Sequence, residues 1–442
     1  MKVTERLLDA YLKRSFARQM YFELGAPVAL PEVGPTQPAV LYIHIPFCES
    51  LCPFCSFHRV RLATAKAMPY FQALRRELRI VADKGYRPSI VYVGGGTPTI
   101  LPEELAATLS LVHSLFPVRQ VSVETNPNHL REDVLAVLQR AGVHRLSVGI
   151  QTFDDALLRN MGRYAPYGGG AQNRERLRFA QGRFDTLNAD MIFNLPGQTE
   201  ASLIRDLEIL AEDIRVDQAS MYPLMASRRT EKAMRQTMGN YSLDNEKRFY
   251  QRLRQVLAQD YTLSSVWCFS RKPGLIDEYI IADTNYVGVG SGAFSYLDGV
   301  IYANTFAIDR YVRMINATGA AVTAHRILLD VDQARYDLVM NLFGLSLSEN
   351  LFRYKYGGRF FSLLRKEFLA LRLSGAILDE GDRIRLTRRG QYYWVIAMRD
   401  FFSGVNNFRD QMRNHVRVER ATQDLAFAPG SDMHRDAGAE KY

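Results

Sequence analysis

The sequence contains only four cysteines among 442 residues, and this scarcity argues against a disulfide-stapled secreted protein. No apolar run approaches the roughly 18 residues that a membrane-spanning helix needs. The first residues, Met1 to Arg6, carry early charges, and no apolar signal-peptide segment follows them. We therefore expect a cytoplasmic protein with no membrane partner.

The remaining composition is close to that of an average globular protein, with 47% hydrophobic and 23% charged residues. The net charge of +9 would suit a nucleic acid, an acidic protein or an anionic small molecule. Because the basic residues are dispersed along the chain, the charge alone favours none of these partners.

Short β-rich runs alternate with helix-like stretches from Val40 onward. The predicted strands are Val40–Ile45, Ile90–Val93, Gln120–Glu124, Arg145–Ile150, Leu187–Phe193 and Gln218–Tyr222. The predicted helices between them include Met68–Lys84, Pro102–Phe116, Arg131–Ala141 and Glu200–Glu212. Such alternation predicts parallel βαβ units. The expected fold class is therefore α/β, a partial (β/α)6 barrel with its functional groups at the carboxyl ends of the strands.

The chain is expected to have four parts. These are an N-terminal helix and connector (residues 1–39), a barrel with its extension (40–319), a winged-helix-like α+β domain (320–400) and a C-terminal extension with a disordered end (401–442). The winged-helix-like part is predicted from two helices, Val331–Phe343 and Phe361–Leu373, and a hairpin that turns at Glu380–Asp382. The second helix is half apolar, so we expect it to pack on the barrel and not to bind nucleic acid.

Three of the four cysteines, Cys48, Cys52 and Cys55, lie on the loop that follows the first predicted strand. The pattern is Cys-x3-Cys-x2-Cys. Thiolates bind iron–sulfur clusters, which usually take four of them, so three would leave one iron open for another ligand. The alternatives are a zinc site with His58 as a fourth ligand and a group of core cysteines.

Polar groups also follow the other predicted strands. The second strand ends in Gly94-Gly-Gly-Thr97, where glycines allow a close backbone approach to a ligand. Later strands end near Glu124, Gln151 and Asp190. Parallel strands bring these groups to one face, which predicts a binding site beside the cysteine loop.

With these motifs in place, the chain resembles the radical S-adenosylmethionine (SAM) superfamily, in the branch of oxygen-independent coproporphyrinogen III dehydrogenase (HemN). The resemblance runs from about Val40 to Phe401 and rests on HIPFC-x3-C-x2-C, GGGTPT, ExNP, RLSVGIQTF and LPGQT. It implies a [4Fe–4S] cluster on Cys48, Cys52 and Cys55. It also implies a SAM that is split into methionine and a 5′-deoxyadenosyl radical, with a reduced flavodoxin-type electron donor.

Members of this branch bind two SAM molecules, and the resemblance assigns residues to each. The cluster-bound SAM is expected to contact Tyr42, Gly95 and Glu124. The second SAM is expected to contact Phe54, Gly96, Thr97, Gln151, Arg163, Asp190 and the backbone at Met225. A carboxylate can accept hydrogen bonds from an amino group or ribose hydroxyls, and an arginine can hold a carboxylate through two bonds.

Three members of the branch remain possible. The dehydrogenase has a further cysteine after the triplet, and the haem chaperone HemW usually has Cys-Asp-Phe there, whereas this chain has Ser56-Phe57-His58. Together with the leader of about 40 residues and the long tail, this resembles the haem-degrading methyltransferases of the HutW/ChuW type. The expected function is thus methylene addition to a haem meso carbon, with ring opening to a linear tetrapyrrole and iron release. The chaperone and the dehydrogenase are the alternatives.

Several other residues are assigned structural roles by default. His44 is expected to point inward near the cluster in a structural role, with proton transfer as the alternative. His58 is expected to be a solvated loop residue, and the alternative is that it contacts haem or covers the cluster. Cys268 is interpreted as a buried small apolar residue. Arg59 and Arg61 are expected on an exposed loop, with contact to haem propionates as the alternative.

Overall fold

The computed structural model describes residues 22–34, 36–272 and 285–426. The predicted N-terminal helix, Arg6–Glu23, lies outside the described residues as far as position 21. The last residue of that prediction, Glu23, is the first residue of strand β1 (Glu23–Val28). Of the end that was predicted to be disordered, the part up to Ala426 is helical. The residues from 427 onward lie outside the described residues.

A single curved sheet forms the centre of the molecule. The six predicted strands lie side by side in it as β2 (Val40–Ile45), β5 (Ile90–Gly95), β6 (Gln120–Thr125), β7 (Arg145–Gln151), β8 (Thr186–Phe193) and β9 (Gln218–Pro223). All of their pairings are parallel. These strands are apolar along most of their length and bury both faces, as parallel strands covered by helices do.

Antiparallel strands continue the sheet on both sides. Beyond β9 lie β11 (Cys268–Ser270) and β10 (Thr262–Leu263). Beyond β2 lie β12 (Tyr286–Val289), which is still parallel, and then β13 (Phe294–Leu297), β14 (Val300–Asn304), β15 (Val322–Ile327) and β1. Since β1 and β10 are the ends of this order among the described strands, the sheet is open. The predicted α/β fold is therefore confirmed.

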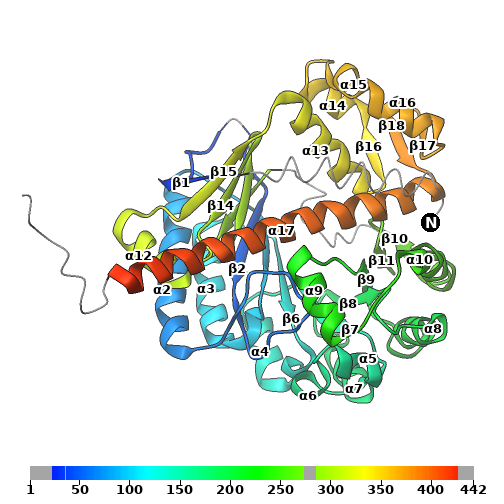
Figure 1. The fold of residues 1–442 in the computed structure, drawn as a ribbon, viewed down its shortest axis with the longest axis horizontal. Helices are drawn as coiled ribbons and strands as arrows, with labels where there is room; N and C mark the ends of the chain where they lie inside the picture. Colours follow the sequence, from blue (N-terminus) through cyan, green and yellow to red (C-terminus); the bar gives the residue numbers. More distant parts are fainter. Residues whose placement is uncertain (1–21, 35, 273–284, 427–442) are drawn as a thin grey trace, which may run out of the picture.

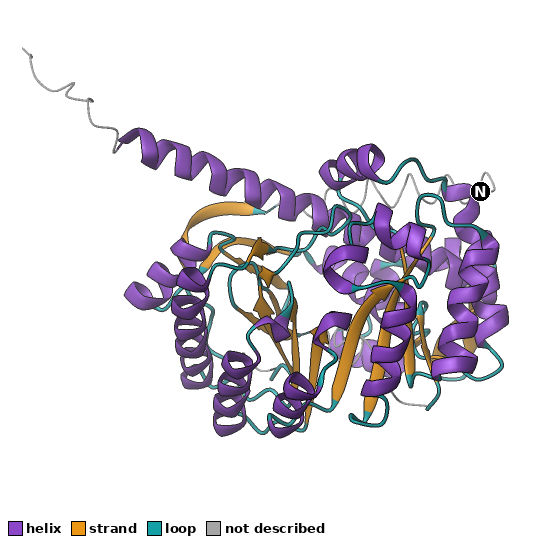
Figure 2. Cartoon of the chain, turned by 90° about the horizontal axis from the view of Figure 1, so that it is seen from below, coloured by secondary structure: helices purple, strands orange, loops and turns teal. Residues whose placement is uncertain are grey.

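Helices cover the outside of the curved sheet (Figure 2). They are α2 (Thr64–Asp83), α3 (Pro102–Leu115), α4 (Glu132–Arg140), α5 (Asp155–Asn160), α6 (Tyr164–Tyr167), α7 (Gly170–Ala180), α8 (Glu200–Glu208), α9 (Arg228–Thr237), α10 (Leu243–Leu257) and α12 (Ile308–Thr318). Their starts follow local sequence signals. Asp154, for example, accepts hydrogen bonds from the amides of Ala156 and Leu157 and so caps α5.

A small α+β module follows the sheet. It consists of α13 (Asp330–Phe343), β16 (Ser346–Ser348), α14 (Glu349–Lys355), α15 (Phe360–Leu363), α16 (Arg365–Leu373), β17 (Ile377–Glu380) and β18 (Arg383–Leu386). The predicted hairpin is β17–β18, with Gly381 at a positive φ of 63° in its turn. The predicted helix Phe361–Leu373 is broken at Leu364 into α15 and α16, and α16 packs against α15 and β17 of its own module.

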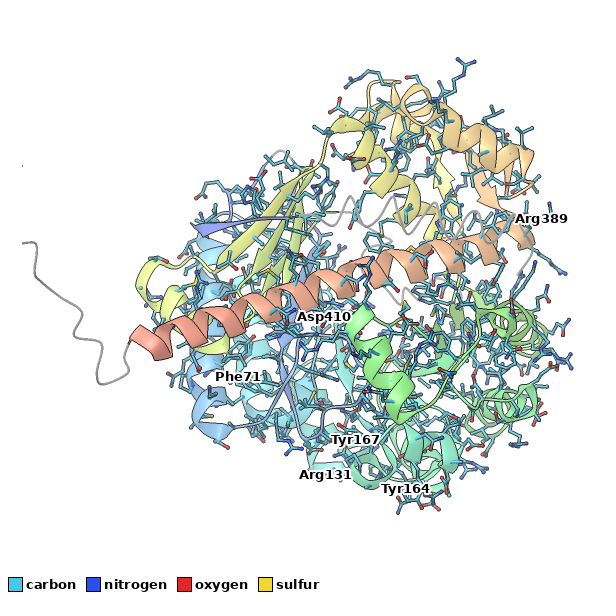
Figure 3. The ribbon with its side chains drawn as sticks, viewed as in Figure 1. Phe71, Arg131, Tyr164, Tyr167, Arg389 and Asp410 are labelled. Carbon is cyan, nitrogen blue, oxygen red and sulfur yellow. The ribbon has the colours of Figure 1, made fainter. Side chains whose placement is uncertain are left out.

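One long helix, α17 (Arg388–Ala426), leaves this module and crosses the molecule (Figure 1). It runs between β14 and β15 on one side and α9 on the other. Figure 3 marks Arg389 at its start and Asp410 in its second half. The expected boundary between residues 400 and 401 thus lies inside one continuous helix. None of the described helices, α17 included, combines the length and apolar character of a bilayer span.

Candidate functional site

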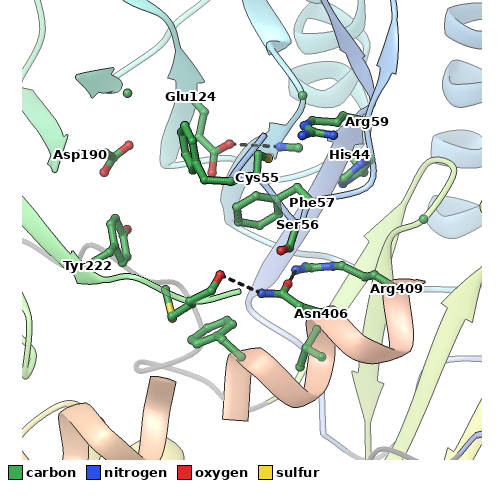
Figure 4. Close-up of a pocket in the computed structure, with 18 of the residues that line it drawn as sticks. His44, Cys55, Ser56, Phe57, Arg59, Glu124, Asp190, Tyr222, Asn406 and Arg409 are labelled. Atoms are coloured by element: carbon green, nitrogen blue, oxygen red, sulfur yellow. Dashed lines mark hydrogen bonds between the residues drawn. The ribbon is translucent and has the colours of Figure 1, made fainter. Parts of the chain in front are cut away.

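A cavity of about 340 Å³ lies where the parallel strands end, and α17 closes its far side (Figure 4). Every predicted site residue except Thr97 lines it. These are Tyr42, Cys48, Cys52, Phe54, Cys55, Gly95, Gly96, Glu124, Gln151, Arg163, Asp190 and Met225. The order of parallel strands explains why groups far apart in the sequence meet here.

Cys48 ends β3 (Phe47–Cys48), and Cys52 and Cys55 lie on the loop between β3 and β4 (Val60–Arg61). The hydroxyl of Thr97 donates a hydrogen bond to Cys48 Sγ at 3.6 Å. Burial raises the pKa of the Cys48 thiol to about 12, although the Thr97 hydrogen bond acts in the opposite direction. A metal centre would displace this proton, since only the thiolate is a ligand.

Two arginines hold this loop. Arg163 donates to Cys52 Sγ at 3.5 Å, to Asn126 Oδ1 at 2.9 Å and to the Gly149 carbonyl at 2.5 Å. Arg59 donates to the Cys52 carbonyl oxygen. Burial alone would lower the pKa of Arg59, but the negative charges of the nearby cysteines raise it overall. Two cations beside three thiols suit an anionic thiolate-ligated cluster.

The position of His58 does not favour the zinc alternative, in which its ring would be the fourth metal ligand. Its ring is buried, its Nε2 hydrogen-bonds Ser291 Oγ at 3.2 Å, and its centroid lies 4.8 Å from that of Phe306. The expectation of a solvated loop histidine is also wrong, because only 3% of the residue is exposed. The structure uses His58 to pack the cluster loop against the turn after β12.

The glycines after β5 are required by close packing. Gly95 has a φ of 119°, and a Cβ there would lie 2.7 Å from the His44 ring. A Cβ at Gly96 would lie 2.6 Å from the Phe47 carbonyl oxygen. Any larger residue would push this strand end away from the cysteine loop. His44 itself points inward as expected, and it hydrogen-bonds the Tyr42 hydroxyl at 2.8 Å.

Two partly buried carboxyl groups line the cavity from β6 and β8, the strands on either side of β7. Glu124 accepts hydrogen bonds from the Tyr92 hydroxyl at 2.9 Å and the Gly95 amide at 3.1 Å, and burial raises its pKa. Asp190 accepts from Ser147 Oγ at 2.7 Å, and burial raises its pKa to about 7. Such groups are suited to bind a cation or a ligand rich in hydroxyl groups.

The remaining predicted residues surround this face. Gln151 ends β7 with an unusual positive φ of 73°, where the register of β7 against β8 shifts. Phe54 packs against a small apolar cluster that contains Leu157 and Met161. The Met225 carbonyl oxygen, after β9, accepts a hydrogen bond from Asn406 of α17 at 3.5 Å.

Most of the opposite wall was not predicted from the sequence, apart from the run Asn285–Ser295, which the resemblance to the branch implied to line the active site. It is mostly aromatic and consists of Phe22, Tyr286, Phe294, Tyr296, Ile301, Tyr336, Phe401, Phe402, Val405, Asn406 and Arg409. A usable signal was present in α17: Phe401, Val405, Phe408 and Met412 recur at helical spacing and mark one apolar face. That pattern predicts a buried helix face but not the surface that it covers.

Comparison with known proteins fits this geometry. Residues 42–210 match the Radical SAM superfamily. The chain is 29% identical to the "Heme chaperone HemW" of Lactococcus lactis over 80% of this chain and 94% of that protein. It is 27% identical to the "Oxygen-independent coproporphyrinogen III oxidase" of Escherichia coli, over 70% of this chain and 72% of that protein. This chain thus carries a radical SAM domain at residues 42–210, and along most of its length it is similar to proteins of the HemN-like branch.

The radical SAM protein shares its fold with a solved relative. The structure of HemN from Escherichia coli superposes with a TM-score of 0.72 at 23% identity, covering 88% of this chain and 93% of that one. The similarity therefore includes the α+β module as well as the sheet. Membership of the superfamily implies a [4Fe–4S] cluster and SAM.

The prediction of a haem-degrading methyltransferase is wrong. Relatives aligned over 79–83% of this radical SAM protein are named haem chaperones, and others are coproporphyrinogen III oxidases. The error came from interpreting the residues after the cysteine triplet, Ser56-Phe57-His58, together with the leader and the long tail, as marks of function. In the structure Ser56 is buried, and its hydroxyl donates to Thr230 Oγ1 at 3.1 Å, which ties the cysteine loop to α9.

Proposed function

We propose that this radical SAM protein binds haem and acts as a haem chaperone of the HemW type. One observation carries the proposal: the cysteine loop and the aromatic wall of α17 face each other across one continuous cavity. A planar, largely apolar macrocycle fits a pocket in which most of one wall is aromatic. The long alignment with named haem chaperones supports the same function.

The cluster is proposed to bind at Cys48, Cys52 and Cys55, with Arg59 and Arg163 balancing its charge. When bound, the cluster and SAM supply one-electron chemistry that the protein itself cannot perform, and we propose a flavodoxin-type reductant. Glu124 would accept hydrogen bonds from the amino group of the cluster-bound SAM, beside Tyr42 and the backbone of Gly95.

A second SAM is proposed beside the first. Its residues would be Phe54, Gly96, Gln151, Arg163, Asp190 and the backbone at Met225, all of which line the cavity. Thr97, also expected there, would act indirectly, because its hydroxyl bonds Cys48 Sγ and accepts from Asn126. Equilibrium dialysis with labelled SAM would measure the stoichiometry, and a ratio of one SAM per cluster would refute the second site.

The function is tested with the full chain carrying a reconstituted cluster under anaerobic conditions. Haem is titrated while its Soret absorbance is followed, then SAM and a reductant are added, and the tetrapyrroles are identified by mass. We expect one haem per chain, recovered chemically intact and transferable to an apo-haemoprotein. Coproporphyrinogen III should keep its carboxyl groups. Absence of haem binding, or decarboxylation of coproporphyrinogen III, would overturn the proposal.

A further inference from the structure

Arg409 reaches into the cavity from α17, among the aromatic side chains (Figure 4). Its guanidinium carbon lies 4.7 Å from the ring centroid of Phe57 and 5.7 Å from that of Phe294. Its Nη1 donates to Asn406 Oδ1, one helical turn earlier, at 2.7 Å. Two rings and an amide thus orient a planar cation at the edge of the apolar wall.

The other charged groups of the lining belong to the opposite wall. Glu124 and Asp190 stand at strand ends, while Arg59 and Arg163 donate to atoms of the cysteine loop and its supports. Arg409 therefore supplies a positive charge on the side where the lining is otherwise apolar. That charge acts across the cavity: burial raises the pKa of the Glu124 carboxyl, and Arg409 is one of the groups that partly offset the rise.

The next turn of α17 fixes this arrangement. Arg413 donates to the carbonyl oxygens of Ser56 at 2.5 Å and Phe57 at 2.8 Å. The same helix thus holds the backbone of Phe57 and stacks Arg409 on its ring. A guanidinium that is already oriented loses less conformational entropy when it forms a two-bond contact with a carboxylate.

We propose that Arg409 is the carboxylate-recognition residue of this cavity and that it binds a propionate group of the haem. The inference rests on the proposed function and names the group that orients the macrocycle. It takes the place of the alternative in which Arg59 and Arg61 meet the propionates. Arg59 is engaged with the Cys52 carbonyl, and Arg61 is an exposed residue of β4 outside the lining.

The test compares haem with haem dimethyl ester, in which both propionates are blocked. Each is titrated into cluster-loaded wild type, Arg409→Gln and Arg409→Lys. Arg389→Gln is the control, because Arg389 is exposed on the same helix outside the lining. Cluster absorbance reports whether each variant is folded and loaded.

Wild type should bind haem roughly ten- to hundredfold more tightly than the ester, the range expected for one charge-assisted hydrogen-bonded contact. Arg409→Gln should lose that preference while its affinity for the ester stays unchanged. Arg409→Lys should keep part of the preference, because charge remains but the planar fork is gone. Arg389→Gln should match the wild type.

The outcomes separate the two proposals. If wild type binds neither compound, the haem function is wrong and the role of Arg409 falls with it. If wild type binds haem but does not distinguish the ester, or if Arg409→Gln keeps the wild-type preference, the haem function stands and the inference about Arg409 is wrong.

Discussion

The two walls of the cavity differ in chemistry and in origin. The strand-end wall carries thiols, buried carboxyl groups and glycines, and its residues come from motifs between Tyr42 and Met225. The opposite wall, here called the α17 wall, is mostly aromatic, with Arg409 as its cation. Its residues on α17 begin some 175 residues after Met225, at Phe401. The first wall is suited to cofactors and the second to a substrate or cargo.

This contrast teaches that one cavity can contain two separable functions. Changes in the strand-end wall should affect cluster and SAM chemistry, whereas changes in the α17 wall should affect haem binding alone. Hydrogen bonds join the walls at a few points, such as Arg413 to the Phe57 carbonyl. The predictions below use variants that act on one wall at a time.

The largest effect is expected at the cysteine loop. Replacing Cys48, Cys52 or Cys55 with Ala should abolish the absorbance of the cluster and all SAM cleavage, because each removes one of three thiolate ligands. Cys268→Ala should leave both largely intact, since Cys268 is buried in β11 outside the cavity lining. Iron and sulfide analysis measures the outcome. Loss of the cluster in the Cys268 variant would refute the three-ligand assignment.

The next effect concerns the anchor of α17. Arg399 donates to both carboxylate oxygens of Glu246 on α10, at 2.6 and 2.7 Å, and this pair is almost fully buried. Arg399→Met removes the cation that pairs both Glu246 and the buried Asp400. It should cost about 3–5 kcal/mol of unfolding free energy, measured with denaturant. The fold-decrease in haem affinity should be larger than the fold-decrease in the rate of SAM cleavage.

The double variant Arg399→Met/Glu246→Gln is the control for this anchor. Because it removes the charge of one of the two buried carboxylates that Arg399 pairs, Glu246 and Asp400, it should regain part of the lost stability. Equal loss of haem affinity and SAM cleavage in the single variant would show that the two walls do not act separately.

Much of the strand-end wall follows from the sequence, and the reason is geometric. A run such as Val40–Ile45 predicts a buried strand, and parallel strands present their carboxyl ends at one edge. Glu124 near the end of β6 and Asp190 in the second half of β8 could therefore be placed on the same side of the sheet before the structure was known. The resemblance to a known branch supplied their roles, which remain proposals.

The α17 wall could not be predicted in the same way. An apolar helix face such as Phe401 and Val405 indicates burial, but its partner depends on tertiary packing. β12 was also missed, because its pairing with β2 joins residues about 245 positions apart, as in Tyr286 with Val40. Ser56 was misread because its buried contact with Thr230 is invisible in the sequence.

A smaller effect is expected at Asp190, whose folded-state pKa of about 7 exceeds its usual value near 3.9. The stability contributed by its proton is complete below about pH 4 and is lost as pH rises through about 7. Asp190→Asn has no carboxyl group at this position, so its stability does not decrease with pH in this way. In the ligand-free protein, its stability relative to wild type should rise between these pH values, by at most about 1.4 kcal/mol per pH unit.

Asp133→Asn is the control for this pH series, because hydrogen bonds and charge from Arg131 hold the pKa of that exposed carboxyl below its usual value. Its relative stability should stay flat over the same range. A flat series for Asp190→Asn would mean that the carboxyl is ionised in the folded protein, and the strand-end wall would then bear a full negative charge.

The most direct test of the central claim fills the α17 side of the cavity. Val405→Trp adds bulk to the lining, and Arg388→Trp adds the same side chain at an exposed position of the same helix. Haem affinity and SAM cleavage are measured for each in the cluster-loaded protein. The account predicts that Val405→Trp weakens haem binding at least about tenfold while SAM cleavage persists, and that Arg388→Trp changes neither. Unchanged haem affinity in Val405→Trp, or loss of SAM cleavage together with haem binding, would contradict it.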